Sequence, residues 1–391
     1  MTTVLAGARV VTPDTVLDPG WLRVDDTRIA ALGAGAPPPD AGALDLRGGY
    51  VVPGFVDMHV HGGGGAAYTT GDPEEARAAA AFHRTHGTTT TMASLVTAAI
   101  DDIERALRAL APLVDEGVLA GVHLEGPYLS REHPGAHDPA LLRAPDAAEL
   151  DRLLRAGAGT VRMVTVAPEL PGALELVRRT VAAGALAAIG HTAATYAQAR
   201  AAFDAGARVA THLFNAMRAL HHREPGPAVA ALEDERVTIE LINDGVHLHD
   251  AAAALAFARA GPARTALITD AMAAAGMADG AYRLGGLEVR VRDGVARLAK
   301  GDSIAGSTLT LDVAVRRAVR DLGLPIAAAA RAAATTPARA LGLGDRTGAL
   351  EAGKQADLVV LGDDLAVRAV MAGGEWVGAA AAAERGAPSA H

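Results

Sequence analysis

Residues 51–65, VVPGFVDMHVHGGGG, join a short apolar run to two histidines and a run of glycines. The apolar residues predict a buried β-strand that ends with Asp57 to His61. Successive side chains of a strand point to opposite faces, so His59 and His61 point to the same face. Two imidazoles on one face can bind one metal ion through ring nitrogen. This stretch therefore predicts a strand with a metal-binding pair at its carboxyl end.

The segments that follow alternate between apolar strand-length runs and helix-length segments. Eight strands that alternate with helices predict a (β/α)8 TIM barrel, an α/β fold, over residues 53–343. A doubly wound sheet is the alternative, but no strand is followed by G-x-G-x-x-G or by G-x-x-x-x-G-K-[ST]. The predicted strands lie in 51–60, 88–96, 118–126, 161–168, 186–192, 208–215, 237–244 and 265–271, and helices are clearest at 74–86, 101–117 and 195–206.

The two ends of the chain resemble each other and differ from the middle. Residues 4–33 read as short strands separated by Pro, Asp and Gly, and residues 347–377 have the same pattern. We therefore expect a small β-sandwich domain built from both termini, residues 1–52 and 344–391, beside the barrel.

Composition narrows the classes of function. The 391 residues include 45 acidic and 36 basic side chains, and no basic tract offsets the net charge of -9, so a nucleic-acid partner is not expected. Cysteine is absent, which excludes disulfides, thiolate metal sites and cysteine nucleophiles. The sequence has neither a secretory signal pattern nor an apolar run long enough for a membrane span, so we expect no membrane association and a cytoplasmic location.

Acidic residues or histidines also end four other predicted strands. A single histidine at a strand end is more often structural, whereas a buried carboxylate is costly unless it is paired or coordinated. Five of eight strands carry such a residue at the end where barrel enzymes place their chemistry, which favours a divalent-metal site. Imidazole and carboxylate without thiolate favour zinc and leave iron, manganese and cobalt open. The four residues are Glu125, His191, His212 and Asp270.

Several motifs resemble those of N-acetylglucosamine-6-phosphate deacetylases, a family of the amidohydrolase superfamily. The resemblance runs nearly end to end, including ADLVVL at 356–361. In order, the motifs are DMHVHGGGG (57–65), HLEGPYLS (123–130), GHTAATYAQ (190–198), THLFNAM (211–217), REPG (223–226), NDGVH (243–247), LITDAMAAAG (267–276) and IAGSTLT (304–310).

The resemblance implies a ligand set. It assigns the main ion to Glu125, His191 and His212. Because His59 and His61 are retained, the chain is expected to bind either one ion or two. Relatives in the superfamily often bridge two ions with a carboxylated lysine, and no lysine lies near the barrel motifs. Glu125 resembles the residue that replaces this lysine as the bridging ligand.

The resemblance also implies a reaction, the hydrolysis of an N-acetylated amino-sugar phosphate to acetate and glucosamine 6-phosphate. A metal ion lowers the pKa of bound water towards ~7. Asp270 would accept the water proton and return it to the leaving amine, and His137 in GAHDP would stabilise the oxyanion. Arg223 would reach the active site of a partner subunit, which implies a homodimer. The substrate contacts implied are Ala136, His137, Asn215, Ala216, Arg223, His247, Ile304, Ala305 and Gly306.

Two other kinds of protein stay open at this point. The first is a different amidohydrolase, such as a dihydroorotase, a D-aminoacylase or a deacetylase for galactosamine phosphate. The second is a non-catalytic scaffold on the same barrel, which the complete set of ligands and the acid/base residue disfavours. The absence of a G-x-S-x-G elbow argues against a serine hydrolase.

Overall fold

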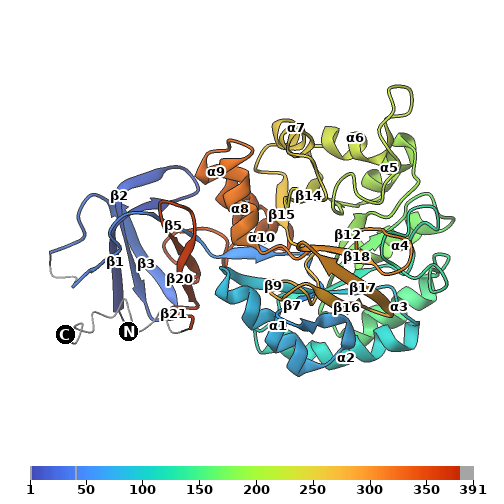
Figure 1. The fold of residues 1–391 in the computed structure, drawn as a ribbon, viewed down its shortest axis with the longest axis horizontal. Helices are drawn as coiled ribbons and strands as arrows, with labels where there is room; N and C mark the ends of the chain where they lie inside the picture. Colours follow the sequence, from blue (N-terminus) through green and yellow to red (C-terminus); the bar gives the residue numbers. More distant parts are fainter. Residues whose placement is uncertain (1, 40–41, 379–391) are drawn as a thin grey trace. The chain divides into compact units, whose positions relative to one another are not determined.

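A computed structural model of the chain describes residues 2–39 and 42–378 (Figure 1). The chain divides into two compact units. One comprises Met1–Asp57, His83–Thr90 and Leu311–His391, and the other comprises Met58–Phe82 and Thr91–Thr310. The domain boundaries predicted from the sequence, at residues 52 and 344, differ from this division. Which residues fold together as one domain stays a prediction.

The central sheet has eight parallel strands in unbroken chain order, β15-β14-β13-β12-β11-β10-β9-β6. Each of the eight predicted runs contains one of these strands, and the predicted barrel is confirmed. Their runs of Val, Ile, Leu and Ala are buried on both faces, as strands enclosed by helices must be. The strands are β6 (Phe55–Asp57), β9 (Thr88–Val96), β10 (Gly121–Glu125), β11 (Val161–Val166), β12 (Leu186–Ile189), β13 (Val209–Ala210), β14 (Thr238–Ile242) and β15 (Thr265–Ile268).

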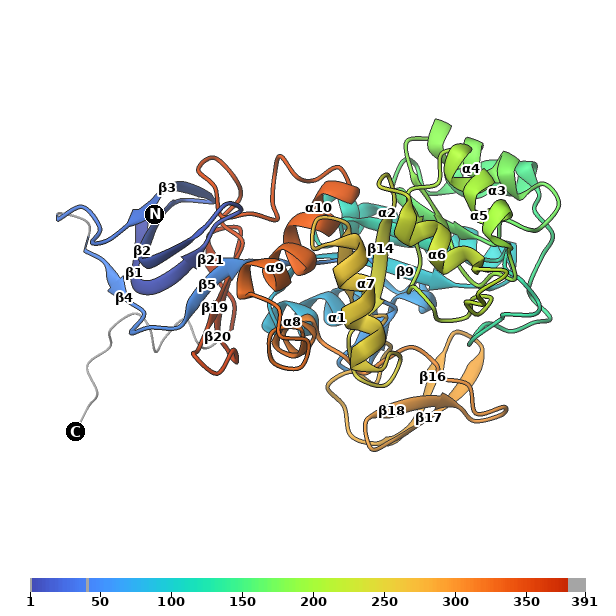
Figure 2. The same cartoon turned by 90° about the horizontal axis from the view of Figure 1, so that it is seen from above.

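One helix follows each of the first seven strands, and helices α2 to α7 lie around the outside of the strands (Figures 1 and 2). In α2 the apolar residues Ile103, Leu107 and Leu110 recur at helical spacing and are buried. Helix α5 begins with a capping box between Thr195 and Gln198. The helices are α1 (Pro73–Thr85), α2 (Ile100–Asp115), α3 (Ala147–Ala156), α4 (Ala173–Ala182), α5 (Tyr196–Asp204), α6 (Gly226–Glu233) and α7 (Asp250–Ala260).

A three-stranded antiparallel sheet follows β15, and it was not expected from the sequence. It consists of β16 (Gly280–Leu284), β17 (Leu287–Arg292) and β18 (Val295–Leu298), and it is separate from the barrel strands in Figure 2. Its alternating apolar residues, such as Val289 and Val291, form a small core with Ala305. A second small ribbon, β7 (Gly62–Gly63) with β8 (Ala66–Ala67), and a 3-10 turn (Tyr68–Thr70) follow β6.

Both ends of the chain contribute to one sheet in the other unit, with the order β21-β20-β19-β5-β1-β2-β3 and β4 paired with β1. This confirms the predicted small β unit. Its buried side chains, including Leu22, Ile29 and Leu358, share one core. The strands are β1 (Thr2–Val11), β2 (Val16–Asp25), β3 (Arg28–Ala34), β4 (Leu44–Asp45), β5 (Tyr50–Pro53), β19 (Leu358–Leu361), β20 (Val367–Ala372) and β21 (Glu375–Trp376).

The same unit contains the last helical segments. These are α8 (Leu311–Arg320), α9 (Ile326–Ala330), a π-helical turn (Arg331–Thr335) and α10 (Thr336–Ala340). The final residues of the predicted terminal domain, 379–391, lie outside the described residues. Among residues 2–39 and 42–378, no helix combines the length and apolar character needed to cross a membrane.

Candidate metal centre and active site

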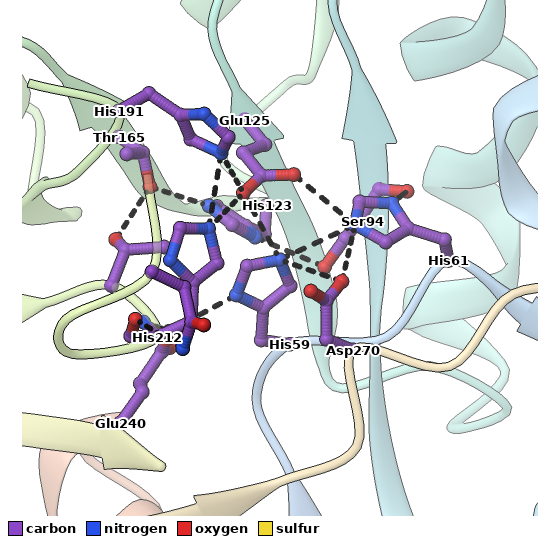
Figure 3. Close-up of polar contacts among 12 residues, drawn as sticks. His59, His61, Ser94, His123, Glu125, Thr165, His191, His212, Glu240 and Asp270 are labelled. Carbon is purple, nitrogen blue, oxygen red and sulfur yellow. Dashed lines mark hydrogen bonds and ion pairs between the residues drawn. The ribbon is translucent and has the colours of Figure 1, made fainter. Parts of the chain in front are cut away.

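Four of the predicted site residues share one position relative to their strands. His59, His191, His212 and Asp270 each lie two residues beyond the last residue of β6, β12, β13 and β15, and Glu125 is itself the last residue of β10. Because the carboxyl ends of parallel strands meet at one rim of a barrel, this placement brings their side chains together. Figure 3 shows the five side chains directed towards one another.

The backbone at three of these positions is unusual. His191, His212 and Asp270 have φ angles of 47°, 29° and 49°, in the left-handed region that side chains other than glycine rarely adopt. Such strain persists only where the surroundings fix it, and it concentrates at functional sites. Between β10 and β11 the register shifts at Val122 and His123, because Arg162 of β11 is an extra residue between their partners.

Glu125, His191 and His212 form one group of metal-ligand type. Their donor atoms lie within 4.8 Å of one another and the residues are buried. Glu125 Oε1 is 3.1 Å from Nε2 of both imidazoles, which are 3.0 Å apart. Ligands about 2.0–2.1 Å from a tetrahedral zinc ion lie about 3.3 Å apart, so these spacings fit an ion at their centre after a small expansion.

His59, His61 and Asp270 form a second buried group of the same kind. His61 Nε2 lies 3.1 Å from Asp270 Oδ1, and His59 Nε2 lies 3.6 Å from the same oxygen. Glu125 also contacts this group, because its Oε2 is 3.1 Å from His61 Nε2. One carboxylate therefore has an oxygen towards each group, the arrangement that a bridging ligand requires.

The charges of these residues depend on one another. Burial alone would raise the pKa values of the Glu125 and Asp270 carboxyls, but the surrounding imidazoles, His59 first among them, hold both pKa values below their usual ranges. Burial would lower the pKa of His61, but hydrogen bonds to Asp270 and Glu125 raise it to about 9. Burial and then His137 lower the pKa of His191 to about 4. Ionised carboxylates and a neutral His191 imidazole are the forms that bind a cation.

A cavity of about 420 Å³ opens over the two groups. Its wall brings together residues from distant parts of the sequence, and apolar Val96 and Leu284 lie beside the polar ones. The predicted site residues that line it are His61, Glu125, Ala136, His137, His191, His212, Asn215, Ala216, His247, Asp270, Ile304 and Gly306.

The structure places three predicted residues away from the cavity wall. His59 is fully buried beneath it, with its ring edge against His123 at a centroid distance of 4.6 Å. Ala305 is buried in the small core of β16–β18. Arg223 is exposed, and its Nη1 is 2.9 Å from Nε2 of His222.

The chain is similar in sequence to a known protein family. A model described as "Amidohydrolase family" matches residues 50–377. The chain belongs to the amidohydrolase family. This confirms the superfamily membership that the motifs indicated.

Relatives of this amidohydrolase include deacetylases of two amino-sugar phosphates. It is 40% identical to an N-acetylgalactosamine-6-phosphate deacetylase from Escherichia coli O157:H7, over 96% of this chain and 99% of that protein. It is 37% identical to an N-acetylglucosamine-6-phosphate deacetylase from Vibrio furnissii, over 88% and 87%. The resemblance to this group of deacetylases is confirmed.

Solved structures from Mycobacterium smegmatis are similar over nearly the whole chain. An N-acetyl-D-glucosamine-6-phosphate deacetylase matches with 53% identity and a TM-score of 0.93, over 96% of this chain and 100% of that one. An aspartate-to-alanine mutant of that enzyme, in complex with N-acetyl-D-glucosamine-6-phosphate, matches with a TM-score of 0.94 at 53% identity, over 96% and 99%.

The amidohydrolase site also contains residues to which sequence reasoning gave no role. Glu240 on β14 is fully buried and contacts both ligand groups. His123 lies below the ligands, between Ser94 Oγ at 3.0 Å and Thr165 Oγ1 at 2.8 Å. Burial and then neighbouring His59 lower the pKa of His123, so it is neutral and polar rather than charged. A charged residue inside an apolar strand was the available signal for Glu240.

Proposed function

We propose that this amidohydrolase removes the N-acetyl group of N-acetyl-D-glucosamine 6-phosphate and releases acetate and D-glucosamine 6-phosphate. The observation that carries the proposal is one cavity lined by residues of two metal-ligand groups, among them the Asp270 carboxylate, and by Asn215 and Ala216 of the loop after β13. The family membership and relatives with this activity support it.

The resident cofactor is one or two zinc ions, held by Glu125, His191 and His212 and by His59 and His61. Imidazole and carboxylate without thiolate suit zinc, with iron, manganese and cobalt as the alternatives. When bound, such an ion lowers the pKa of water and polarises the amide carbonyl. Metal analysis of the purified protein tests the assignment, and a protein without tightly bound divalent metal would contradict it.

Asp270 is the proton carrier. Its carboxylate lines the cavity beside His61, and its lowered pKa keeps it ionised, so that its oxygens face the attacking water as acceptors. As the water oxygen bonds to the carbonyl carbon and the carbon–nitrogen bond breaks, Asp270 returns this proton to the amine nitrogen. The products are acetate and a free amine.

His137 donates a hydrogen bond to the carbonyl oxygen. The backbone N–H of Thr97 donates to Nδ1 of His137 at 3.2 Å, so in the neutral ring the hydrogen lies on Nε2. Nε2 faces the centre, 3.4 Å from Glu125 Oε2. A donor fixed in this way can stabilise the negative charge that develops on the oxygen.

The phosphate binds at the loop after β13. Positive φ angles at His212, Phe214 and Ala216 fold this loop tightly, and Asn215 and Ala216 line the cavity. Asn215 Nδ2 donates to the carbonyl oxygens of His212 and Leu213, so its amide braces the loop. His247 completes the site, because Asp244 Oδ2 contacts its Nδ1 at 2.6 Å and leaves Nε2 for the ligand. Ala136, Ile304 and Gly306 line the sugar, with Ala305 supporting the loop from behind.

The enzyme acts as a homodimer in which Arg223 reaches the partner's cavity. Exposure of Arg223 and its absence from the described lining of its own cavity support this arrangement. Mixing inactive Asp270→Asn and Arg223→Gln subunits tests it, since hybrid dimers would regain activity at one site. A monomer in sedimentation experiments would rule it out. A phosphorylated sugar does not cross membranes unaided, so we place the reaction in the cytoplasm, which cell fractionation tests.

Substrate preference is the direct test of the proposal. We expect kcat/KM for N-acetylglucosamine 6-phosphate to exceed that for N-acetylglucosamine by at least about 100-fold, because each charge-assisted hydrogen bond to phosphate contributes about 1.5–3 kcal/mol. Acetate release from both sugars measures it, and a higher kcat/KM for the unphosphorylated sugar would defeat the proposal.

The galactosamine relative makes N-acetylgalactosamine 6-phosphate the second candidate substrate. The two sugar phosphates differ only in the orientation of one hydroxyl, so the same assay should include both. A larger kcat/KM for the galactosamine compound would transfer the assignment to it and leave the metal chemistry unchanged.

A further inference from the structure

Glu240 is a buried carboxylate that the proposed reaction does not use. It lies on β14 with no exposed surface, between the apolar residues Ile239 and Leu241. Its Oε2 lies 3.0 Å from His59 Nδ1 and accepts the backbone N–H of His212 at 3.1 Å (Figure 3). One oxygen therefore contacts a residue of each ligand group.

The contact with His59 fixes which nitrogen faces the centre. A carboxylate oxygen accepts hydrogen bonds, so in the neutral ring that binds a cation the hydrogen of His59 lies on Nδ1. Nε2 then directs its lone pair towards the other ligands, 3.3 Å from His61 Nε2 and 3.4 Å from Glu125 Oε1. An acceptor behind a metal-binding imidazole holds both its tautomer and its orientation.

His59 differs from two neighbouring ligands in how it is held. Nδ1 of His61 faces the backbone oxygen of Ser94 at 3.0 Å, and Nδ1 of His191 faces the backbone oxygen of His133 at 3.1 Å. Those acceptors belong to the main chain and no substitution removes them. The acceptor for His59 is a side chain, so the orientation of this one ligand depends on the identity of residue 240.

The second contact reaches the backbone of His212, whose φ angle is 29°. A hydrogen bond from this N–H to a charged acceptor stabilises a conformation that is otherwise strained. A buried carboxylate is a poor source of stability compared with an apolar side chain of similar size. Its two contacts with ligand residues point instead to a role in arranging the metal centre.

We propose that Glu240 is a positioning residue for the second metal ion, which holds His59 in the orientation and tautomer that binds this ion and ties it to the His212 loop. The proposal rests on the metal-dependent function proposed above. It predicts that residue 240 controls how many ions the chain binds, while Glu125, His191 and His212 hold the first ion without it.

The test is the zinc stoichiometry and affinity of Glu240→Gln. Glutamine keeps the shape, and its one oxygen can accept from both N–H donors, but without the negative charge these hydrogen bonds are only about half as strong. We expect the wild-type chain to bind two zinc ions and the variant to bind one tightly, with affinity for the other at least about 10-fold weaker. Metal analysis after dialysis against buffered zinc measures both, independently of turnover.

Thr165→Val is the matched control. Thr165 is fully buried in the same barrel interior, and its Oγ1 bonds His123 Nε2 and Thr211 Oγ1 without contacting a ligand imidazole. Loss of this polar group should leave two ions bound. If only general damage to the barrel mattered, both variants would lose the same ion and the proposal would be wrong.

A measurement on the wild-type chain keeps the proposal open to refutation even if Glu240→Gln does not fold. In zinc-loaded protein with 15N-labelled histidine, we expect the His59 ring to carry its hydrogen on Nδ1 and none on Nε2, with the signal assigned through His59→Gln. Hydrogen on Nε2, a wild-type chain that binds one ion, or two ions at unchanged affinity in Glu240→Gln would each overturn it. Failure of the wild-type chain to deacetylate the sugar phosphate would instead defeat the proposed function.

Discussion

Asp270→Asn should lower kcat for deacetylation by about 10³- to 10⁴-fold and leave the ion held by Glu125, His191 and His212 in place. General acid–base catalysis contributes about 10²- to 10⁴-fold, and here one carboxylate performs both proton transfers. Asparagine occupies the same volume and its oxygen can still face His61, but it cannot take up a proton. Steady-state kinetics together with metal analysis on the same sample measures both effects.

A second aspartate provides the control for this substitution. Asp234 is buried too, and it pairs with Arg236 and Arg200 rather than with the cavity. Asp234→Asn should lower the stability of the fold and keep kcat close to the wild-type value. If Asp270→Asn retains more than about a tenth of wild-type kcat, a group other than Asp270 moves the proton.

The arrangement of the barrel and of its ligands could be predicted because both follow from chain order. Parallel strands joined by helices must place every carboxyl end at one rim, so residues as distant as His59 and Asp270 meet once the strands are assigned. The rule needs no knowledge of side-chain packing. The rule also tolerates errors of a few residues in the predicted strand ends, since four of the site residues lie two positions past the strand ends rather than within the strands.

The remaining features depend on contacts between residues that are distant in the sequence, and no local sequence pattern encodes these contacts. Strand β14 can bury Glu240 because His59 and His212 supply donors from beyond the ends of other strands, and the residues next to 240 do not indicate which partners these are. Asn215 Nδ2 likewise donates within its own loop because the fold places the carbonyl oxygens of His212 and Leu213 beside it. The β16–β18 sheet was missed because its short strands follow the last barrel strand, where a helix is the usual continuation.

Glu125→Gln should abolish the binding of both ions and lower kcat/KM by at least about 10⁴-fold, which corresponds to about 5.4 kcal/mol. Glu125 is the ligand with an oxygen towards each group, within 3.1 Å of His61, His191 and His212. Without its charge, imidazoles face one another around the centre, and the carboxylates of Asp270 and Glu240 are left to balance an added cation. Loss of either ligand group alone would be less severe.

Zinc-dependent stability gives this prediction a readout apart from turnover. A ligand at 100 times its Kd stabilises the fold that binds it by about 2.7 kcal/mol, so zinc should raise the Tm of the wild-type chain and leave that of Glu125→Gln unchanged. Glu240→Gln is the graded comparison, because it should keep the shift due to the first ion and lose the rest. If Glu125→Gln still bound two ions, the carboxylate would not bridge the groups, and each set of histidines would have to hold its ion alone.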